Sequence, residues 1–225
     1  MMRKNLRYYD IILAIFASIL LISNLAATKL VAFGPIIADG GAILFPLSYI
    51  FDDILTEVYG FKYARRAIWT AFGVMLIGVL AFTIVRYLPV APEYSDQLAF
   101  ESVLGFFPRI VVASLTAFLV GSFMNSFVLS KLKIRTKGKK LWLRLIGSTI
   151  VGELLDTIIF SLVAFGGILT ARDMTIYIVE GWLFKTMVEV VLLPVTYRVI
   201  AFIKKGEGLD VYDKKTNFTP FKIKV

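Results

Sequence analysis

The sequence predicts an all-α integral membrane protein, in which a single domain (residues 1–225) forms a bundle of six transmembrane helices. Hydrophobic residues make up 58% of the chain and the mean hydropathy is +0.80, whereas soluble domains contain about 45–50% apolar residues. These residues gather in six tracts, each close to the ~20 residues that a helix needs to cross a bilayer. The Lys and Arg residues collect between alternate tracts, as in multi-pass proteins.

The expected helices occupy residues 10–28, 41–60, 67–87, 109–130, 141–165 and 177–203. The first tract is followed by Lys29 and by no small-residue cleavage site, which argues against a signal peptide. The sixth is long enough to tilt or break, and Pro194 marks the expected kink. Two sets of three helices that start on opposite sides would permit a 3+3 inverted repeat. Residues 206–225 are expected to form a short cytosolic tail.

The basic residues orient the predicted helices. With the N-terminus inside, 20 of the 25 Lys and Arg residues fall on the cytoplasmic side, four fall outside, and Lys185 lies within a tract. The positive-inside rule therefore predicts a protein of the cytoplasmic membrane with both termini in the cytosol. The net charge of +9 reflects this topology and favours anionic lipid headgroups over nucleic acid as its partner.

Several function classes lack the residues that they need. The chain has no Cys and no His, so thiolate chemistry and the commonest metal ligand are missing. No H-E-x-x-H, G-x-S-x-G or P-loop motif indicates a metalloprotease, a serine hydrolase or an ATPase. No T-V-G-Y-G filter or Arg-rich helix indicates a potassium channel or a voltage sensor. We expect no enzyme activity, cofactor or metal.

Ionisable residues inside the second tract are the first sign of a functional site. Such groups cost a few kcal/mol each at membrane depth, so they normally face a cavity or one another. Asp53 and Glu57 are four residues apart and share a helix face, whereas Asp52 points about 100° away. The alternative for Glu57, which lies near the inner end, is an ion pair with Lys62 or Arg65.

The fifth and sixth tracts add further charges. Glu153 and Asp156 lie one turn apart near mid-membrane, and Thr149 extends their face. Two carboxylates this close would not both stay ionised in a dry site. Two alternatives with a purely structural role remain open. Either Asp156 pairs with Lys185, or Lys185 pairs with Glu189 at the i, i+4 spacing of an intrahelical ion pair.

Asn24 in the first tract and Asn125 in the fourth either bond a neighbouring helix or contact a ligand. Arg109 opens the fourth tract, where snorkelling to the outer interface also explains it. Together the pattern favours a carrier of a small polar solute. The candidate substrate-binding residues are Asn24, Asp53, Glu57, Asn125, Glu153, Asp156, Lys185 and Glu189.

Several motifs occur in order along nearly the whole chain. They are Ser23-Asn24 with Lys29, Phe45-Pro46, Asp53-x-x-x-Glu57-x-x-Gly60 with Ala64-Arg65-Arg66, Arg109 with Ser114, Glu153-x-x-Asp156-Thr157, and Lys185 before Pro194. At these motifs the chain resembles the queuosine precursor transporter family, also called the vitamin uptake transporter family. The motif of the second tract is the most specific of them. The doubled Asp52-Asp53 is a small departure, since only Asp53 keeps the spacing to Glu57.

The resemblance implies six helices and uptake of a 7-deazaguanine such as preQ0 or preQ1, the precursors of the modified tRNA base queuosine. An archaeal member of the family would instead serve archaeosine, which starts from the same base. Asp53, Asp156 and Lys185 occupy motif positions. One carboxylate can accept both the N1–H and the exocyclic NH2 of such a base. Stacking aromatic residues are expected among Tyr49, Phe51 and Phe160.

Three other interpretations stay open at this point. A substrate-binding subunit of an energy-coupling-factor vitamin importer also has six helices, but it needs an ATPase partner on its cytoplasmic face. A membrane enzyme would use Asp53 and Asp156 as an acid–base pair, which requires the two carboxylates to lie within reach of each other. A purely structural subunit would leave the intramembrane charges unexplained. The sequence does not determine the exact base, the driving force or whether the protein forms a homo-oligomer.

Overall fold

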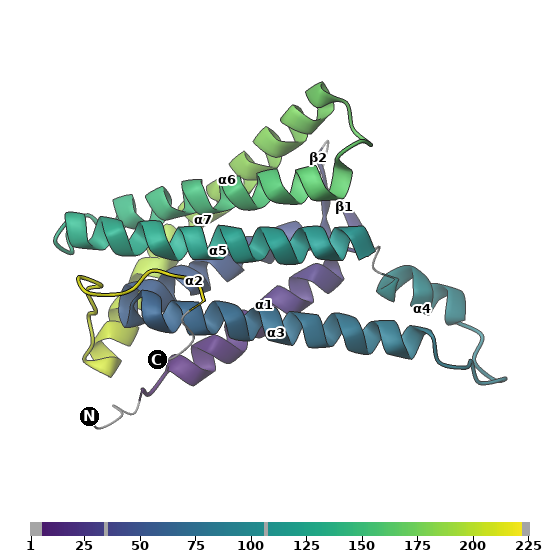
Figure 1. Ribbon diagram of the computed structural model, residues 1–225, viewed down its shortest axis with the longest axis horizontal. Coiled ribbons are helices and arrows are strands. Elements are labelled where there is room, and N and C mark those ends of the chain that lie inside the picture. Colours follow the sequence, from purple (N-terminus) through teal and green to yellow (C-terminus); the bar gives the residue numbers. More distant parts are fainter. Residues whose placement is uncertain (1–5, 34–35, 106–107, 222–225) are drawn as a thin grey trace.

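The computed structural model describes residues 6–33, 36–105 and 108–221 (Figure 1). The chain forms long helices joined by short connections, with a small antiparallel hairpin after the first helix. The elements are α1 (Tyr9–Ala26), β1 (Leu30–Phe33), β2 (Ile36–Asp39), the 3-10 helix η1 (Gly40–Ile43), α2 (Phe45–Tyr59), α3 (Phe61–Arg86), α4 (Gln97–Leu104), α5 (Pro108–Arg135), α6 (Leu141–Phe165) and α7 (Ala171–Glu207).

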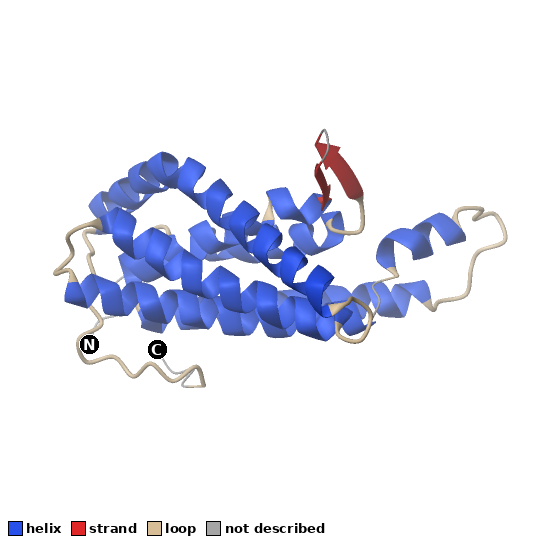
Figure 2. Cartoon of the chain, turned by 90° about the horizontal axis from the view of Figure 1, so that it is seen from above, coloured by secondary structure: helices blue, strands red, loops and turns tan. Residues whose placement is uncertain are grey.

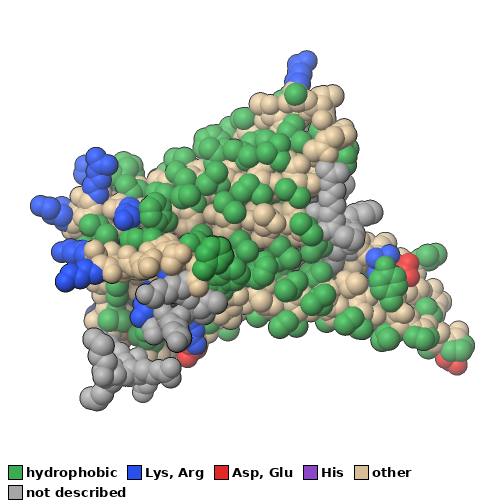
Figure 3. All heavy atoms as spheres, in the orientation of Figure 1, with side chains coloured by type: hydrophobic (Ala, Val, Ile, Leu, Met, Phe, Trp, Pro, Cys, Tyr) green, Lys and Arg blue, Asp and Glu red, His purple; other side chains and the backbone are tan. Residues whose placement is uncertain are grey.

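Five of the described helices are long and apolar enough to cross a membrane, namely α1, α3, α5, α6 and α7. Their most apolar 18-residue windows have mean hydropathies of 1.7 to 2.3. Hydrophobic side chains cover the middle of the molecule, and Lys and Arg side chains gather at one end (Figure 3). Exposed residues such as Ile77, Ile84 and Val191 belong to this apolar surface. The predicted class, a helical integral membrane protein, is confirmed.

The prediction for residues 27–60 needs correction. The expected helix over 41–60 is divided into η1 and the 15-residue α2, and a β-hairpin with Leu30 opposite Asp39 precedes them. Glycine disfavours helix at Gly40 and Gly41, whereas Pro46 suits the first turn of α2 because a helix leaves its first N–H groups unbonded. The connection between α3 and α5 also contains α4, which was not expected from the sequence. The hairpin and α4 lie toward the same end of the bundle (Figure 2).

Of the remaining helices, α1 and α6 agree closely with the expected ranges, whereas α3 begins at Phe61 instead of residue 67 and α5 ends at Arg135 instead of residue 130. Helix α6 covers the expected residues 141–165. Helix α7 is longer than expected and continues through Pro194, so this residue does not end it. An interior proline removes one backbone hydrogen bond, and packing of the surrounding turns can compensate for that loss.

Helix α1 lies alongside α2 through most of its length. At one end the rings of Tyr9 and Tyr59 meet edge-on, with centroids 5.3 Å apart. At the other end Gly40 lies so close to the carbonyl of Ala26 that a Cβ would sit 2.6 Å from its oxygen. The segment 40–59 therefore spans the same depth as α1.

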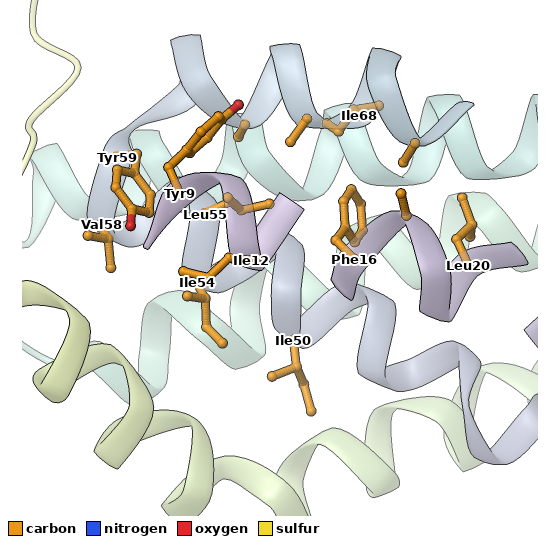
Figure 4. Close-up of a cluster of buried hydrophobic side chains, with 14 of the residues drawn as sticks. Tyr9, Ile12, Phe16, Leu20, Ile50, Ile54, Leu55, Val58, Tyr59 and Ile68 are labelled. Atoms are coloured by element: carbon orange, nitrogen blue, oxygen red, sulfur yellow. The ribbon is translucent and has the colours of Figure 1, made fainter. Parts of the chain in front are cut away.

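The hydrophobic core fills the space between α1, α2 and α3 (Figure 4). Phe16 and Leu20 of α1 and Leu55 of α2 are fully buried. Helix α3 contributes small buried residues at helical spacing, including Ala64 and Ala71, which allow neighbouring helices to approach closely. This core supports α2 from one side and leaves its acidic residues to face α5, α6 and α7.

The end of the chain is not a free tail. Residues 208–221, here called the C-terminal strap, return along the ends of α3 and α5 (Figure 1). Asp213 in the strap accepts hydrogen bonds from the backbone N–H of Phe61 (2.9 Å) and from the hydroxyl of Ser130 (3.0 Å). Arg65 donates to two backbone carbonyls of the strap at 3.0 and 2.7 Å. The polar composition of residues 206–225 predicted a tail. The contacts of Asp213 and Arg65 show that its described part is docked on the bundle.

We expect Asp213→Ala to destabilise the protein by about 1.5–3 kcal/mol, because it removes hydrogen bonds to a buried charged acceptor and leaves the N–H of Phe61 unpaired. Unfolding in detergent micelles measures the effect. Lys214→Ala is the matched control, since Lys214 is exposed on the same strap. Equal stabilities of the two variants would show that the strap does not anchor the α2–α3 connection.

Candidate functional site

A cavity of about 10 Å³, room for about one water molecule, lies between α2, α6 and α7. A larger ligand therefore requires these helices to move apart. One wall is acidic and hydroxyl-rich and the other is aliphatic. The lining residues are Ile50, Asp53, Leu145, Ile146, Thr149, Thr186, Glu189, Val190, Leu193 and Thr196.

Asp53 reaches the cavity from α2 and is held by two other helices. Its Oδ1 accepts hydrogen bonds from Asn125 of α5 at 2.8 Å and from Ser148 of α6 at 3.4 Å. The same Asn125 amide donates to Asp52 at 3.2 Å, and Asp52 accepts a second bond from Ser126 at 2.9 Å. Neighbours in sequence thus have different surroundings: Asp53 lines the cavity, and Asp52 is directed to α5. This is the divergence that their 100° offset predicts.

Glu153 and Glu189 bridge α6 and α7 in a reciprocal arrangement. Glu189 of α7 accepts a hydrogen bond from Thr149 of α6, and Glu153 of α6 accepts one from Thr186 of α7 at 3.3 Å. The two acids are 0% and 7% exposed, respectively. Among the described residues, Oε1 of each carboxylate has no hydrogen-bond partner. Each acid therefore keeps one buried oxygen available for a proton or a ligand.

Asp156 forms an ion pair with Lys185 across α6 and α7, with 2.8 Å between Oδ2 and Nζ. The ammonium also lies 4.6 Å from the ring centre of Phe45, a cation–π contact from the start of α2. Of the two open alternatives for Lys185, the structure shows the pair with Asp156. Lys185 is directed to α6, and Glu189, four residues along its own helix, bonds Thr149 instead.

Glu57 joins the ends of four helices. Arg144 of α6 binds both of its oxygens, at 2.7 and 3.2 Å. Lys204 of α7 lies 2.6 Å from Oε1, and Lys133 of α5 lies 3.4 Å from it. Both lysines also contact Asp210 of the strap, at 2.7 and 2.6 Å. We call Glu57, Lys133, Arg144, Lys204 and Asp210 the inner ion cluster.

The inner ion cluster departs from the expected pairing of Glu57 with Lys62 or Arg65. Arg65 donates its hydrogen bonds to backbone carbonyls of the strap instead. Burial tends to raise the pKa of Asp210, but its hydrogen bonds from two lysines hold this pKa below its usual value, so Asp210 remains charged. Arg144 was not expected in this cluster because it was counted among the Lys and Arg residues of the loop between the fourth and fifth tracts. Its position within the fifth tract was the available signal, since an arginine there needs an acidic partner.

Asn24 does not join the carboxylates. Its carbonyl oxygen accepts a hydrogen bond from Ser114 of α5 at 2.7 Å, and its amide lies 3.2 Å from the sulfur of Met75. It lines a separate, mainly apolar cavity of about 20 Å³ between α1, α3 and α5. The sequence could not separate the two cavities because helix order does not say which faces meet. The side chain of Arg109 falls outside the described part of the chain.

Aliphatic residues supply the apolar wall of the site, whereas the sequence analysis expected aromatic rings. Tyr49, Phe51 and Phe160 are absent from the cavity lining. Tyr49 is instead buried between helices, where its hydroxyl donates to the carbonyl of Gly152 at 3.4 Å. The lining of α7 recurs every three or four residues, from Thr186 to Thr196, and this periodicity was the signal in the sequence that could have found it.

The family model described as "Putative vitamin uptake transporter" matches residues 39–199, which include every residue that lines the cavity. The chain belongs to this family. It is 35% identical over 188 residues to the "Probable queuosine precursor transporter" of Bacillus subtilis (strain 168), which covers 82% of this chain and 81% of that one. It is 26% identical over 168 residues to the "Queuosine precursor transporter" of Escherichia coli (strain K12), with 71% of both chains covered. No solved structure matches the chain significantly.

These relatives confirm the resemblance seen in the motifs. The family is one of membrane transporters and not of enzymes. The acid–base interpretation of Asp53 and Asp156 therefore gives way to a transporter with a small-molecule substrate.

The ion pair predicts how α6 and α7 respond to mutation. We expect Asp156→Asn to destabilise the protein by about 3 kcal/mol, because it removes the ion-pair partner of the Lys185 ammonium, whose side chain is only 19% exposed. The double variant Asp156→Asn with Lys185→Met should regain most of that loss in detergent unfolding. If the double variant is no more stable than the single one, the pair does not stabilise the bundle. Recovery of base binding in the double variant would identify Asp156 as a structural partner.

Proposed function

We propose that the protein is a carrier that takes up a 7-deazaguanine base, such as preQ0 or preQ1, through the cavity between α2, α6 and α7. The observation that carries the proposal is the acidic and hydroxyl-rich cavity inside the region that the transporter family model matches. The relatives named above are queuosine precursor transporters, and their substrate class fits the groups available in the cavity.

The chemistry of the cavity supports a flat, guanine-like ligand. The N1–H and exocyclic NH2 groups of the base are adjacent donors, and a single carboxylate can accept both. We assign this role to Asp53, because Asn125 and Ser148 orient it and it lines the cavity, whereas Asp156 already binds Lys185. Hydroxyl groups such as that of Thr196 can donate a hydrogen bond to the carbonyl oxygen of the ligand.

The inner ion cluster has the position and connections of a gate in this proposal. Glu57 lies one helical turn beyond Asp53, and Arg144 lies one turn before Ser148. The cluster therefore closes the side of the cavity toward the C-terminal strap. Alternating access requires these ion pairs to separate when the site opens to that side, and their connections to four helices make the closure cooperative.

We propose six crossings, with η1 and α2 together providing the second one. The segment 40–59 supports this count because it runs beside α1 from Ala26 to Tyr9. Both termini are assigned to the cytosol, since Lys204 near the end of α7 belongs to the inner ion cluster and Lys and Arg side chains gather at one end of the face that Figure 3 shows. The 3+3 inverted repeat would relate α1–α3 to α5–α7 and stays a prediction.

Single introduced cysteines test this orientation without background, because the chain has no native Cys. We expect Ser95→Cys, in the loop after α3, to react with a membrane-impermeant maleimide from outside. Lys137→Cys, in the loop between α5 and α6, should react only after the membrane is permeabilised. The reverse pattern would overturn the assignment of both termini to the cytosol.

Uptake of radiolabelled preQ0 and preQ1 into liposomes that contain only this protein tests the function. We expect uptake above that of empty liposomes for at least one base, with competition by the unlabelled base. Uptake that appears only after an energy-coupling ATPase module is added would contradict a stand-alone carrier. It would instead support the binding subunit of an energy-coupling-factor importer.

Asp53→Asn tests the assigned contact in the same system. The change keeps the shape of the side chain but turns one acceptor oxygen into a donor that faces another donor. Loss of one hydrogen bond to a charged group costs about 1.5–3 kcal/mol, which corresponds to roughly ten- to a hundredfold weaker binding. Asp52→Asn is the matched control, because Asp52 bonds Ser126 away from the cavity. Equal weakening by both changes would argue that Asp53 acts only through the folding of α2.

A further inference from the structure

The membrane interior of this protein contains more acidic than basic groups. Apart from Glu57, five carboxylates of α2, α6 and α7 are at most 7% exposed, and Lys185 is the one cation in the described part of the chain that contacts any of them. The cations of the inner ion cluster are engaged with Glu57 and Asp210. Full ionisation would leave four uncompensated negative charges at membrane depth, which is too costly to persist. The five acids are Asp52, Asp53, Glu153, Asp156 and Glu189.

The hydrogen bonds indicate which acids are neutralised. Asp52 and Asp53 accept bonds from amide and hydroxyl donors of α5 and α6, and Asp156 has an ammonium. Glu153 and Glu189 each receive one hydroxyl bond, and in the described structure their Oε1 atoms have no partner. A proton on such an oxygen removes the negative charge of the carboxylate and turns the oxygen into a hydrogen-bond donor. These two buried acids are therefore the places where added protons relieve the charge excess.

We propose that Glu153 and Glu189 form a proton-binding site and that transport is coupled to the proton they carry. This inference rests on the proposed function, because Glu189 lines the same cavity as Asp53. A proton suits the site better than a metal ion, since the described residues contain no group of three or more His, Cys, Asp or Glu side chains placed to hold one.

The surroundings explain how proton and substrate are coupled. The groups that face the pair are Asp52, Asp53 and Tyr49 from α2, Asp156 from α6, and Lys185 from α7. A proton on Glu189 removes one negative charge next to the cavity. The helices can then move to open the cavity to the other side of the membrane without exposing that charge to hydrocarbon. A proton bound from the outside and released to the cytosol would then drive accumulation of the base.

Neutral preQ0 in liposomes that contain only this protein is the direct probe, with the membrane potential clamped at zero. An outside pH one unit below the inside should drive up to about tenfold accumulation of preQ0 per coupled proton, because one pH unit is a tenfold difference in proton activity. A protonophore should abolish it. Glu153→Gln and Glu189→Gln should equilibrate preQ0 without accumulating it, yet still exchange labelled for unlabelled base. Glu180→Gln, exposed on α7, is the matched control and should accumulate normally.

Three outcomes overturn the proton site: accumulation driven by sodium instead of pH, undiminished accumulation in both Gln variants, or loss of exchange together with accumulation in a folded variant. If the unaltered protein transports neither base, the proposed function fails, and thermal unfolding in detergent still tests the site. Buried neutral acids stabilise the protein at low pH and lose this effect as pH rises. The unaltered protein should therefore lose stability with rising pH relative to Glu153→Gln with Glu189→Gln. A constant difference would refute the proton site.

Discussion

The cost of placing charge in hydrocarbon is the constraint on which the rest of this structure depends. Helix α2 carries three acidic residues within six positions, so it cannot face lipid and needs polar partners on every exposed side. Glu57 forms ion pairs with three cations. Asp53 and Asp52 each accept hydrogen bonds from an amide and a hydroxyl. The packing of α5, α6 and α7 around α2 follows from these requirements.

The same constraint explains why α2 is short and central. Its other side packs against the apolar faces of α1 and α3, and Gly60 then turns the chain directly into α3. Gly60 has a φ of +82°, a conformation that residues with a side chain rarely adopt, and a Cβ there would meet Val211 of the strap at 2.7 Å. The strap thus secures the turn that fixes the end of α2, and with it the depth of Asp53 and Glu57 in the membrane.

The polar groups fall into layers along the bundle, and the layers have different chemistry. The inner ion cluster joins three cations with two acids and ties helices together, whereas Glu153 and Glu189 each retain, among the described residues, one oxygen without a hydrogen-bond partner. Between them, Asp53 is oriented but open to the cavity. In the function proposed above, the paired charges hold a conformation and the available charges bind what is carried.

The sequence by itself determined the membrane class, the five long helices, the asymmetry of basic charge and the family, because hydropathy, charge placement and motif spacing are local properties of the chain. It also identified the acids that line or adjoin the cavity. Only the tertiary structure decided their partners: Glu57 with Arg144, Lys185 with Asp156, and Asn24 in a different cavity. It also decided that residues 41–60 are divided and that the tail is docked. These results depend on which helix faces meet, and contacts between residues far apart in sequence leave no local signal.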